Sequence, residues 1–214
     1  TSMLAYTPSH SRQLPHLQPR HRPLFVTIRS ADPIPEKYLN DYHRYIDTLI
    51  DEETQYPENK ELKIDNNKRA FACLDEIYAR YHGEIDFTEP ESVASLITEN
   101  IRALNGDLCH IYAYTIMPNH LHLLLRPEEQ DGVPVSLAQI MQKLKGVTAR
   151  QVNLLLRRTG SLWYREYYDH WVRSVKEFVN IVEYIRQNPV KAGLVKRAED
   201  WKWTWMDLES EVVV

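Results

Sequence analysis

Cysteine is scarce in this chain of 214 residues: Cys73 and Cys109 are the only two, and they form no CxxC motif. This excludes a disulfide framework and a thiolate zinc site, so we expect two buried thiols. Long apolar runs are also missing, because no stretch approaches the roughly 20 apolar residues that span a bilayer. The first residues show no charged-then-apolar export pattern. We therefore predict a cytoplasmic protein with no membrane partner.

Size and composition favour a single domain. A chain with 43% hydrophobic residues can bury one sizeable core, with room for a large insertion but hardly for two independent domains. Residues 1–23 contain recurring prolines and no periodic apolar pattern, which predicts an extended arm. We assign residues 24–200 to the domain and residues 201–214 to a C-terminal tail.

The charge is unevenly distributed along the chain. The net charge of −4 counts mildly against a nucleic-acid partner. However, residues 32–107 hold 18 acidic and 8 basic residues, whereas residues 141–202 hold 13 basic and 6 acidic ones. Such asymmetry alone is more often a pair of solvated faces than a binding surface. The basic segment gains weight because a helical tyrosine motif lies in it and a histidine motif lies shortly before it.

Hydrophobic periodicity predicts alternating strands and helices. Between the first two helices we expect a polar loop over residues 52–66, and residues 162–172 are strand-prone because they are rich in aromatics. The predicted strands are residues 24–28, 108–116 and 120–125, and the predicted helices are residues 36–51, 67–81, 91–104, a segment from Ser136 to before Gly160, and Ser174 to Asn188.

The strand over residues 120–125 carries two histidines, His120 and His122. Alternate residues of a strand point to the same side, so both imidazoles share one face while three leucines form the other. Two buried, hydrogen-bonded histidines would give the same pattern, but the apolar opposite face leaves the histidine face for chemistry. Two imidazoles with an amide oxygen make a site that tolerates Mg or Mn and leaves positions open for a phosphate oxygen.

The helix ending at Asn188 presents a tyrosine away from its apolar stripe. At about 100° per residue, Tyr184 falls roughly opposite the stripe, and Asn188 lies one turn further on. A surface tyrosine can simply lean on a neighbouring element. It can also attack phosphorus, provided that a base or cation assists the phenol. The candidates for that assistance are Lys191, which we favour, Arg186 or a water held by the ion. The predicted apolar stripe consists of Val175, Phe178, Val179, Val182 and Ile185.

Taken together, these motifs are similar to those of a known family. The chain resembles the HUH single-strand endonucleases and, more narrowly, the REP-associated tyrosine transposases, a branch of the single-tyrosine insertion-sequence transposases. The resemblance runs from about Leu14 to Trp205. The residues that carry it are Leu14–Pro19, Phe25–Thr27, Met117–His122, Trp163–His170 and Tyr184–Val195.

The resemblance implies a fold and a chemistry. It implies an α+β, ferredoxin-like antiparallel sheet with helices on one face, and we interpret residues 32–107 as a helical insertion. It makes Tyr184 the nucleophile that cleaves and rejoins single-stranded DNA at repetitive extragenic palindrome (REP) hairpins through a 5′-phosphotyrosine link. His120 and His122 would hold a divalent metal, Mg or Mn. The partner would be single-stranded or hairpin DNA, and the protein would be a nucleoid-associated monomer or homodimer.

The third metal ligand departs from the family pattern. In related transposases it lies four residues beyond the tyrosine and is often Gln. Here that position is Asn188, while Gln187 lies three residues beyond Tyr184. We favour Asn188 over Gln187.

Basic residues near these motifs are candidates for DNA contacts. Phosphate contacts by arginine and lysine make binding salt-dependent. Tryptophans can stack on unpaired bases, but for Trp201 and Trp203 we favour a role in clamping the tail to the core. The candidate DNA-binding residues are Arg12, Arg20, Arg22, Lys143, Lys145, Arg150, Arg157, Arg158 and Arg165.

Two other functions fit parts of the sequence. The alternative to a transposase is a non-catalytic protein that binds hairpin DNA and regulates repeats, which an intact His-His-Tyr set argues against. A nucleotide hydrolase of the histidine-triad type needs a third alternating histidine. Residue 124 is leucine, so we set that function aside.

Overall fold

The structure is a computed structural model that describes residues 22–81, 83–207 and 209. The predicted arm, including Arg12 and Arg20, lies outside the described residues. The chain divides into two compact units. One holds residues 33–83, and the other holds β1 (Leu24–Arg29) and everything from residue 84 onward. Each unit has a hydrophobic core of its own.

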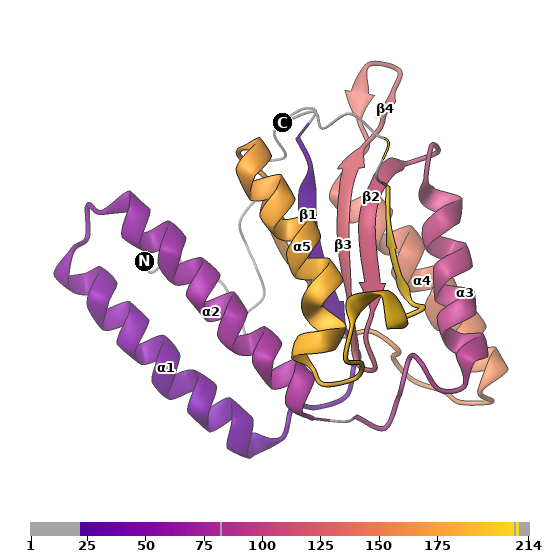
Figure 1. The fold of residues 1–214 in the computed structure, drawn as a ribbon, viewed down its shortest axis with the longest axis horizontal. Coiled ribbons are helices and arrows are strands. Elements are labelled where there is room, and N and C mark those ends of the chain that lie inside the picture. Colours follow the sequence, from indigo (N-terminus) through magenta and orange to yellow (C-terminus); the bar gives the residue numbers. More distant parts are fainter. Residues whose placement is uncertain (1–21, 82, 208, 210–214) are drawn as a thin grey trace. The chain divides into compact units, whose positions relative to one another are not determined.

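The first unit is a helical hairpin of α1 (Glu36–Gln55) and α2 (Lys60–Arg80), which run antiparallel (Figure 1). Its core joins Tyr42, Ile46 and Leu49 to apolar residues of α2. The predicted polar loop over residues 52–66 is wrong, because only four residues separate the helices. The Asn59 side chain caps α2 by accepting a hydrogen bond from the Leu62 backbone.

The second unit is built on a five-stranded antiparallel sheet with strand order β6-β1-β3-β2-β7. The four strands β1, β2, β3 and β6, with the helix before β2 and the helix before β6, follow the order of a ferredoxin-like β-α-β-β-α-β fold, so the predicted fold class is confirmed. A two-stranded ribbon of β4 (Glu129–Gln130) and β5 (Val133–Pro134) extends beyond the sheet. The sheet strands beside β1 are β2 (Cys109–Ile116), β3 (His120–Pro127), β6 (Tyr168–Trp171) and β7 (Thr204–Met206).

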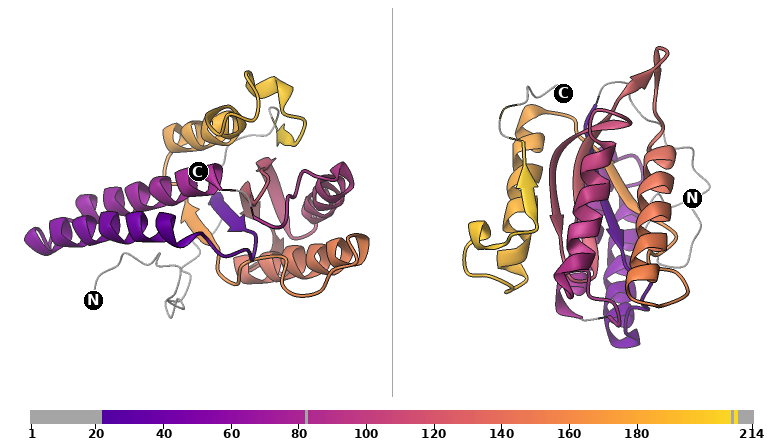
Figure 2. Two further views of the ribbon diagram at one scale, coloured as in Figure 1. Left: turned by 90° about the horizontal axis from the view of Figure 1, so that it is seen from below. Right: turned by 90° about the vertical axis from the view of Figure 1, so that its right-hand side faces the viewer.

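Helices lie on both sides of this sheet (Figure 2). As expected, α3 (Glu91–Leu104) and α4 (Leu137–Leu155) cover one face. The structure adds α5 (Val175–Lys191) on the opposite face, against β2 and β3. Helix α4 begins with a capping box, in which Ser136 and Gln139 satisfy each other's backbone donors.

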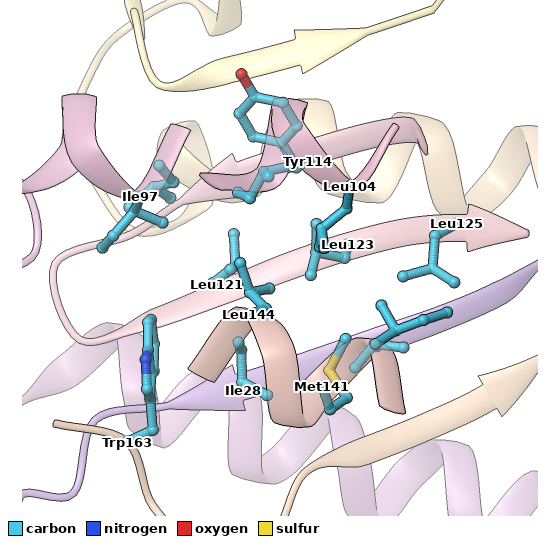
Figure 3. Close-up of a cluster of buried hydrophobic side chains, with 14 of the residues drawn as sticks. Ile28, Ile97, Leu104, Tyr114, Leu121, Leu123, Leu125, Met141, Leu144 and Trp163 are labelled. Atoms are coloured by element: carbon cyan, nitrogen blue, oxygen red, sulfur yellow. The ribbon is translucent and has the colours of Figure 1, made fainter. Parts of the chain in front are cut away.

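The α3/α4 side of the sheet holds the main core (Figure 3). Leu121, Leu123 and Leu125 of β3 point into it, where they meet Met141 and Leu144 of α4. All five are at most 2% exposed. The alternation predicted for the histidine strand therefore holds, and the even-numbered side chains of β3 face α5.

The two ends of the helical insertion meet at Asp32. Its carboxylate accepts hydrogen bonds from the Ile85 backbone at 3.1 Å and from the Ser30 hydroxyl at 3.2 Å. Residues 32 and 85 flank the hairpin on either side. Residues 32 and 85 of the second unit are therefore hydrogen-bonded to each other at the two ends of the inserted hairpin.

The aromatic segment and the end of α5 also differ from the prediction. Only Tyr168–Trp171 of the aromatic segment forms a strand, because Trp163 turns inward and donates to the Thr148 hydroxyl at 2.8 Å. Helix α5 continues through Pro189 to Lys191 rather than ending at Asn188. Proline removes one helical donor, but the Ala192 amide still bonds to the Asn188 carbonyl at 2.9 Å.

The chain beyond α5 returns to the sheet. The Trp201 indole donates to the Ile116 carbonyl at 3.0 Å, β7 pairs with β2, and the Trp205 ring stacks on Tyr114 with centroids 5.9 Å apart. The Ile116 amide also donates to the Trp203 carbonyl at 3.0 Å, so the residues around Trp201 and Trp203 are fastened to the sheet, as we favoured for these two tryptophans. Of the thiols, Cys109 is buried, and burial raises its pKa to about 12, whereas Cys73 is only partly buried.

Candidate active site

The two histidines of β3 lie side by side on the face that α5 covers. Their ring centroids are 4.8 Å apart. His122 is flanked by Thr27 of β1 and Thr115 of β2, which are its register partners on the two neighbouring strands. The pair therefore sits in the middle of the sheet, where backbone pairing on both sides holds the strand.

Each imidazole is oriented through its Nδ1 atom. The Thr27 hydroxyl lies 2.7 Å from Nδ1 of His122, and the Asn119 side-chain oxygen lies 2.7 Å from Nδ1 of His120. Metal-binding histidines are commonly fixed in this way, with one ring nitrogen bonded to an oxygen and the other turned to the ion. The donor set therefore fits a divalent metal held through the two Nε2 atoms.

We expect Thr27→Val to weaken metal binding by about 10- to 100-fold, because it removes the oxygen that orients His122 while keeping the shape of the side chain. Isothermal titration with Mn would measure the loss. The matched control is Thr115→Val on the other side of His122. Its hydroxyl bonds to Thr204 at 2.7 Å, so that variant should bind Mn as the wild type does. Equal losses in both variants would contradict a specific role for Thr27.

Helix α5 brings Tyr184 to the histidine pair. The Tyr184 ring meets His122 edge to face, with centroids 5.6 Å apart, and meets Phe25 at 5.9 Å. The Phe25 ring in turn stacks on His122 at 5.5 Å. The phenol is thus held against the candidate metal ligands from a different element, within one unit of the chain.

The predicted orientation of α5 needs a correction. Val175 and Val179, assigned to the buried stripe, are 57% and 56% exposed. The buried residues of the helix include Phe178, which meets Tyr112 of β2 at 5.0 Å, and Ile185. The helix is therefore rotated relative to the predicted stripe, so that Tyr184 faces the sheet instead of pointing away from it. The sheet's aromatic rings on this face provide the contacts that override the pattern.

Of the two candidate side chains that could activate the phenol, Lys191 contacts the Tyr184 ring and Arg186 contacts Glu183. The Nζ atom of Lys191 is 4.8 Å from the Tyr184 ring centroid. Arg186 instead forms two hydrogen bonds with Glu183, at 2.7 and 2.8 Å, and Gln187 donates to the same carboxylate at 3.0 Å. Arg186, followed by Gln187, lowers the pKa of Glu183 to about 2. Arg186 and Gln187 are thus engaged on the outer side of α5.

Asn188 lies on the inner side of the same helix. It is 4% exposed, one turn beyond Tyr184 and next to the buried Pro189. Asn188 and Gln187 are the two candidates for the third metal ligand, and Asn188 is the buried one. Gln187 is the one whose amide donates to a surface carboxylate.

The candidate DNA-binding residues fall into different environments. Arg150 and Arg157 are exposed, and Arg165 is 89% exposed with Glu166 at 3.7 Å. Lys143 pairs with Asp107 at 2.8 Å, and Arg158 bonds to the Asn153 side chain at 2.6 Å and to the Ser161 carbonyl. Arg22 lies at the start of β1, near Trp171.

The side chain of Lys145 is partly buried and bonds to the backbone. Its ammonium donates to the Tyr164 and Arg165 carbonyls at 2.8 and 2.7 Å, and burial lowers its pKa to about 8. An unfolded lysine titrates near pH 10.4. Between these pH values the unfolded chain binds more protons than the folded one, so stability should rise with pH.

We therefore expect the melting temperature of the wild type, measured relative to Lys145→Met, to rise between pH 8 and 10. Because Lys145 is only partly buried, solvent screening limits the gain to about 1 kcal/mol, or about 2–4 °C. Thermal melts followed by circular dichroism at several pH values would test this. A pH-independent difference between the two proteins would contradict it.

Sequence reasoning assigned no role to the residues that orient the histidines, although Phe25, Thr27 and Asn119 belong to segments that carry the family resemblance. Thr27 lies 95 positions before His122, and only the strand register brings the two together. Asn119 directly precedes His120, so an amide beside a candidate ligand was a local signal. The contacts of Phe25 with His122 and Tyr184 depend on the packing of α5 and were not predicted.

Comparison with known proteins shows what this chain is similar to. Residues 90–188 match the family described as "Transposase IS200 like". That segment includes both histidines, Tyr184 and Asn188. The resemblance to tyrosine transposases is thereby confirmed.

The relatives found by sequence carry more specific names than the family. A Haemophilus influenzae protein named for the REP-associated tyrosine transposases is 29% identical over 108 residues, covering 47% of this chain and 61% of the relative. The REP-associated tyrosine transposase of Escherichia coli K12 is 26% identical over 95 residues, covering 44% of this chain and 52% of the relative. The matches thus span between half and two thirds of these relatives.

A solved structure supports the fold. The structure of a REP-associated tyrosine transposase bound to a REP hairpin superposes with a TM-score of 0.56 at 15% sequence identity. The superposition covers 91% of this chain and 82% of that one. Within the residues that the structure describes, no helix has the length and apolar character of a membrane span.

Proposed function

We propose that this protein is a REP-associated tyrosine transposase that cleaves and rejoins single-stranded DNA at REP hairpins. The observation that carries the proposal is the contact between the Tyr184 ring and His122, which places a nucleophile beside candidate metal ligands. The names of the relatives and of the hairpin-bound structure support the choice of substrate. Its place of action would be the nucleoid in the cytoplasm.

A divalent ion, Mg or Mn, would be held by His120 and His122, with Asn188 as the third ligand. When bound, it would withdraw charge from a phosphodiester and so stabilise the transition state. The oxygens on Nδ1 of both rings would keep the two imidazoles in position for this role.

The chemical step belongs to Tyr184. Its phenolic oxygen attacks phosphorus, the bond from phosphorus to the 3′ oxygen breaks, and the leaving strand ends in a 3′-hydroxyl after taking up a proton. The phenolic proton is lost to solvent as the new bond forms, and the one taken up by the 3′ oxygen balances it. The 5′ phosphate stays on Tyr184, and attack by another 3′-hydroxyl reverses the step, so that rejoining needs no ATP.

Two neighbours assist the phenol. Lys191, whose Nζ lies over the ring 4.8 Å from its centroid, puts a positive charge beside the phenol that would stabilise the negative charge developing on its oxygen. Phe25 contacts the ring edge-on and restricts its orientation relative to His122. We assign Lys191 to catalysis and Phe25 to positioning.

The proposal is tested by incubating the protein with a REP hairpin that carries a single-stranded flank, with Mn present, and separating the products on a denaturing gel. DNA labelled at its 3′ end should become covalently attached to protein. DNA labelled at its 5′ end should instead be released as a shorter strand. Tight hairpin binding without any attached label would favour the non-catalytic regulatory protein.

A further inference from the structure

The edge strand β6 carries an arrangement that the proposed chemistry does not use. Trp171 ends this strand and is 37% exposed. Two guanidinium groups lie over its indole, with Cζ atoms 5.6 Å (Arg22) and 4.8 Å (Arg173) from the ring centroid. Arg22 also donates to the Arg173 carbonyl at 3.3 Å, which ties the two together. We call these three residues the β6 cluster.

The β6 cluster concentrates positive charge without a matching carboxylate. Within the described part of the chain, the guanidinium groups of Arg22 and Arg173 have no acidic side chain within ion-pair distance. The nearby Glu177 is engaged elsewhere, because it bonds to His170 at 3.0 Å and to the Arg173 backbone at 2.9 Å. Two like charges held around one ring repel each other unless an anion lies between or beside them.

The opposite end of the sheet shows a contrasting case. There Lys202 lies over the Trp203 ring, with Nζ 5.0 Å from the centroid. Lys202 also forms an ion pair with Glu91. The charge at that edge is therefore neutralised within the fold, as is usual for a structural cation–π contact. The β6 cluster lacks such a partner.

We propose that the β6 cluster binds an unpaired strand of DNA, with its guanidiniums on phosphates and its indole against a base. Arginine matches phosphate geometry through paired N–H donors, and aromatic side chains stack on bases of any sequence. The proposal rests on the proposed function and deepens it by naming a contact for the single-stranded part of the substrate.

The position of the cluster suits a strand leaving the active site. Trp171 pairs with Leu24 of β1, whose side chain faces the α3/α4 core, whereas His122 pairs with Thr27 on the α5 side, so the indole and the histidines lie on opposite faces of the sheet. Two strand spacings and three residues separate them, or about 14 Å between Cα atoms. An unpaired strand is at least as extended as the roughly 3.4 Å per nucleotide of duplex DNA, so at most about four nucleotides span this distance along the sheet. Because β6 is an edge strand, an unpaired strand that leaves the histidine face could pass round this edge to the cluster.

Noncovalent binding of a labelled oligothymidylate tests the cluster, using Tyr184→Phe protein with EDTA so that cleavage plays no part. Anisotropy titrations over a range of salt should show that Arg22→Gln with Arg173→Gln lowers the slope of log affinity against log salt by about 1.4. Trp171→Leu should lower affinity about 5- to 100-fold and leave the slope unchanged. Trp171→Phe should retain most of the affinity.

The charge-matched control is Arg197→Gln with Lys202→Gln, which removes two cations that already pair with acidic residues. It should bind as the parent does, and melting curves would confirm that every variant folds. Parental affinity and slope in the cluster variants, equal losses in the control, or no binding by the parent would each overturn the assignment. Covalent attachment to hairpins tests the proposed function separately, so either can fail alone.

Discussion

Tyr184→Phe should form no covalent adduct with DNA, a loss of at least about a thousandfold, while binding REP hairpins as tightly as the wild type does. The substitution removes only the phenolic oxygen that attacks phosphorus. The ring remains, so its contacts with His122 and Phe25 are kept. Denaturing gels with 3′-labelled hairpin would measure the adduct, and anisotropy would measure binding.

The matched control for this prediction is Tyr112→Phe. Tyr112 is also a tyrosine on the α5 side of the sheet, where it packs against Phe178. Its loss of a hydroxyl should leave adduct formation unchanged. An adduct that persists in Tyr184→Phe would assign the nucleophile to another residue, and an adduct lost in both variants would point to a general disturbance under α5.

His122→Ala should lower the rate of cleavage by about a thousandfold, and EDTA should do the same to the wild type, with recovery on adding Mn or Mg. A bound metal contributes several kcal/mol to the transition state, and about 4 kcal/mol corresponds to roughly a thousandfold. Cleavage kinetics and Mn titration calorimetry would be measured together, because the variant should also lose metal affinity.

His110→Ala is the control for the histidine prediction. His110 lies on β2, where its Nε2 is 3.4 Å from the Asp207 carboxylate and its register partner is Arg126, four residues beyond His122 on β3. That variant should bind Mn and cleave DNA normally. Cleavage by the wild type in EDTA at an undiminished rate would remove the metal from the reaction and leave the histidines with a structural role.

The sheet and the histidine pair were predictable because their signals are local. Alternation along residues 120–125 fixes which side chains share a face, whatever the strand packs against. The capping box at Ser136 likewise depends on residues three apart. The resemblance to a known family supplied Tyr184 and the fold class from motifs spread along the chain.

Features that depend on distant partners were not predictable in the same way. The orientation of α5 follows from the aromatic rings of Phe25 and Tyr112, which the helix's own periodicity does not contain. The start of α2 was missed because residues 60–66 are mostly polar. In the hairpin, the Asn66 side chain donates to the Leu49 carbonyl of α1. Arg69, just beyond this polar stretch, pairs with Glu52 of α1 at 2.7 Å.

The hydrogen bond at Asp32 allows the helical hairpin to vary in length without changing the rest of the fold. Because Asp32 pins the returning chain at Ile85, the ferredoxin-like unit is closed independently of how many residues lie between them. The entropy of closing such a loop grows only slowly with its length. Evolution could therefore lengthen, shorten or exchange the hairpin without disturbing the register of β1 against β3, on which the contact between Thr27 and His122 depends.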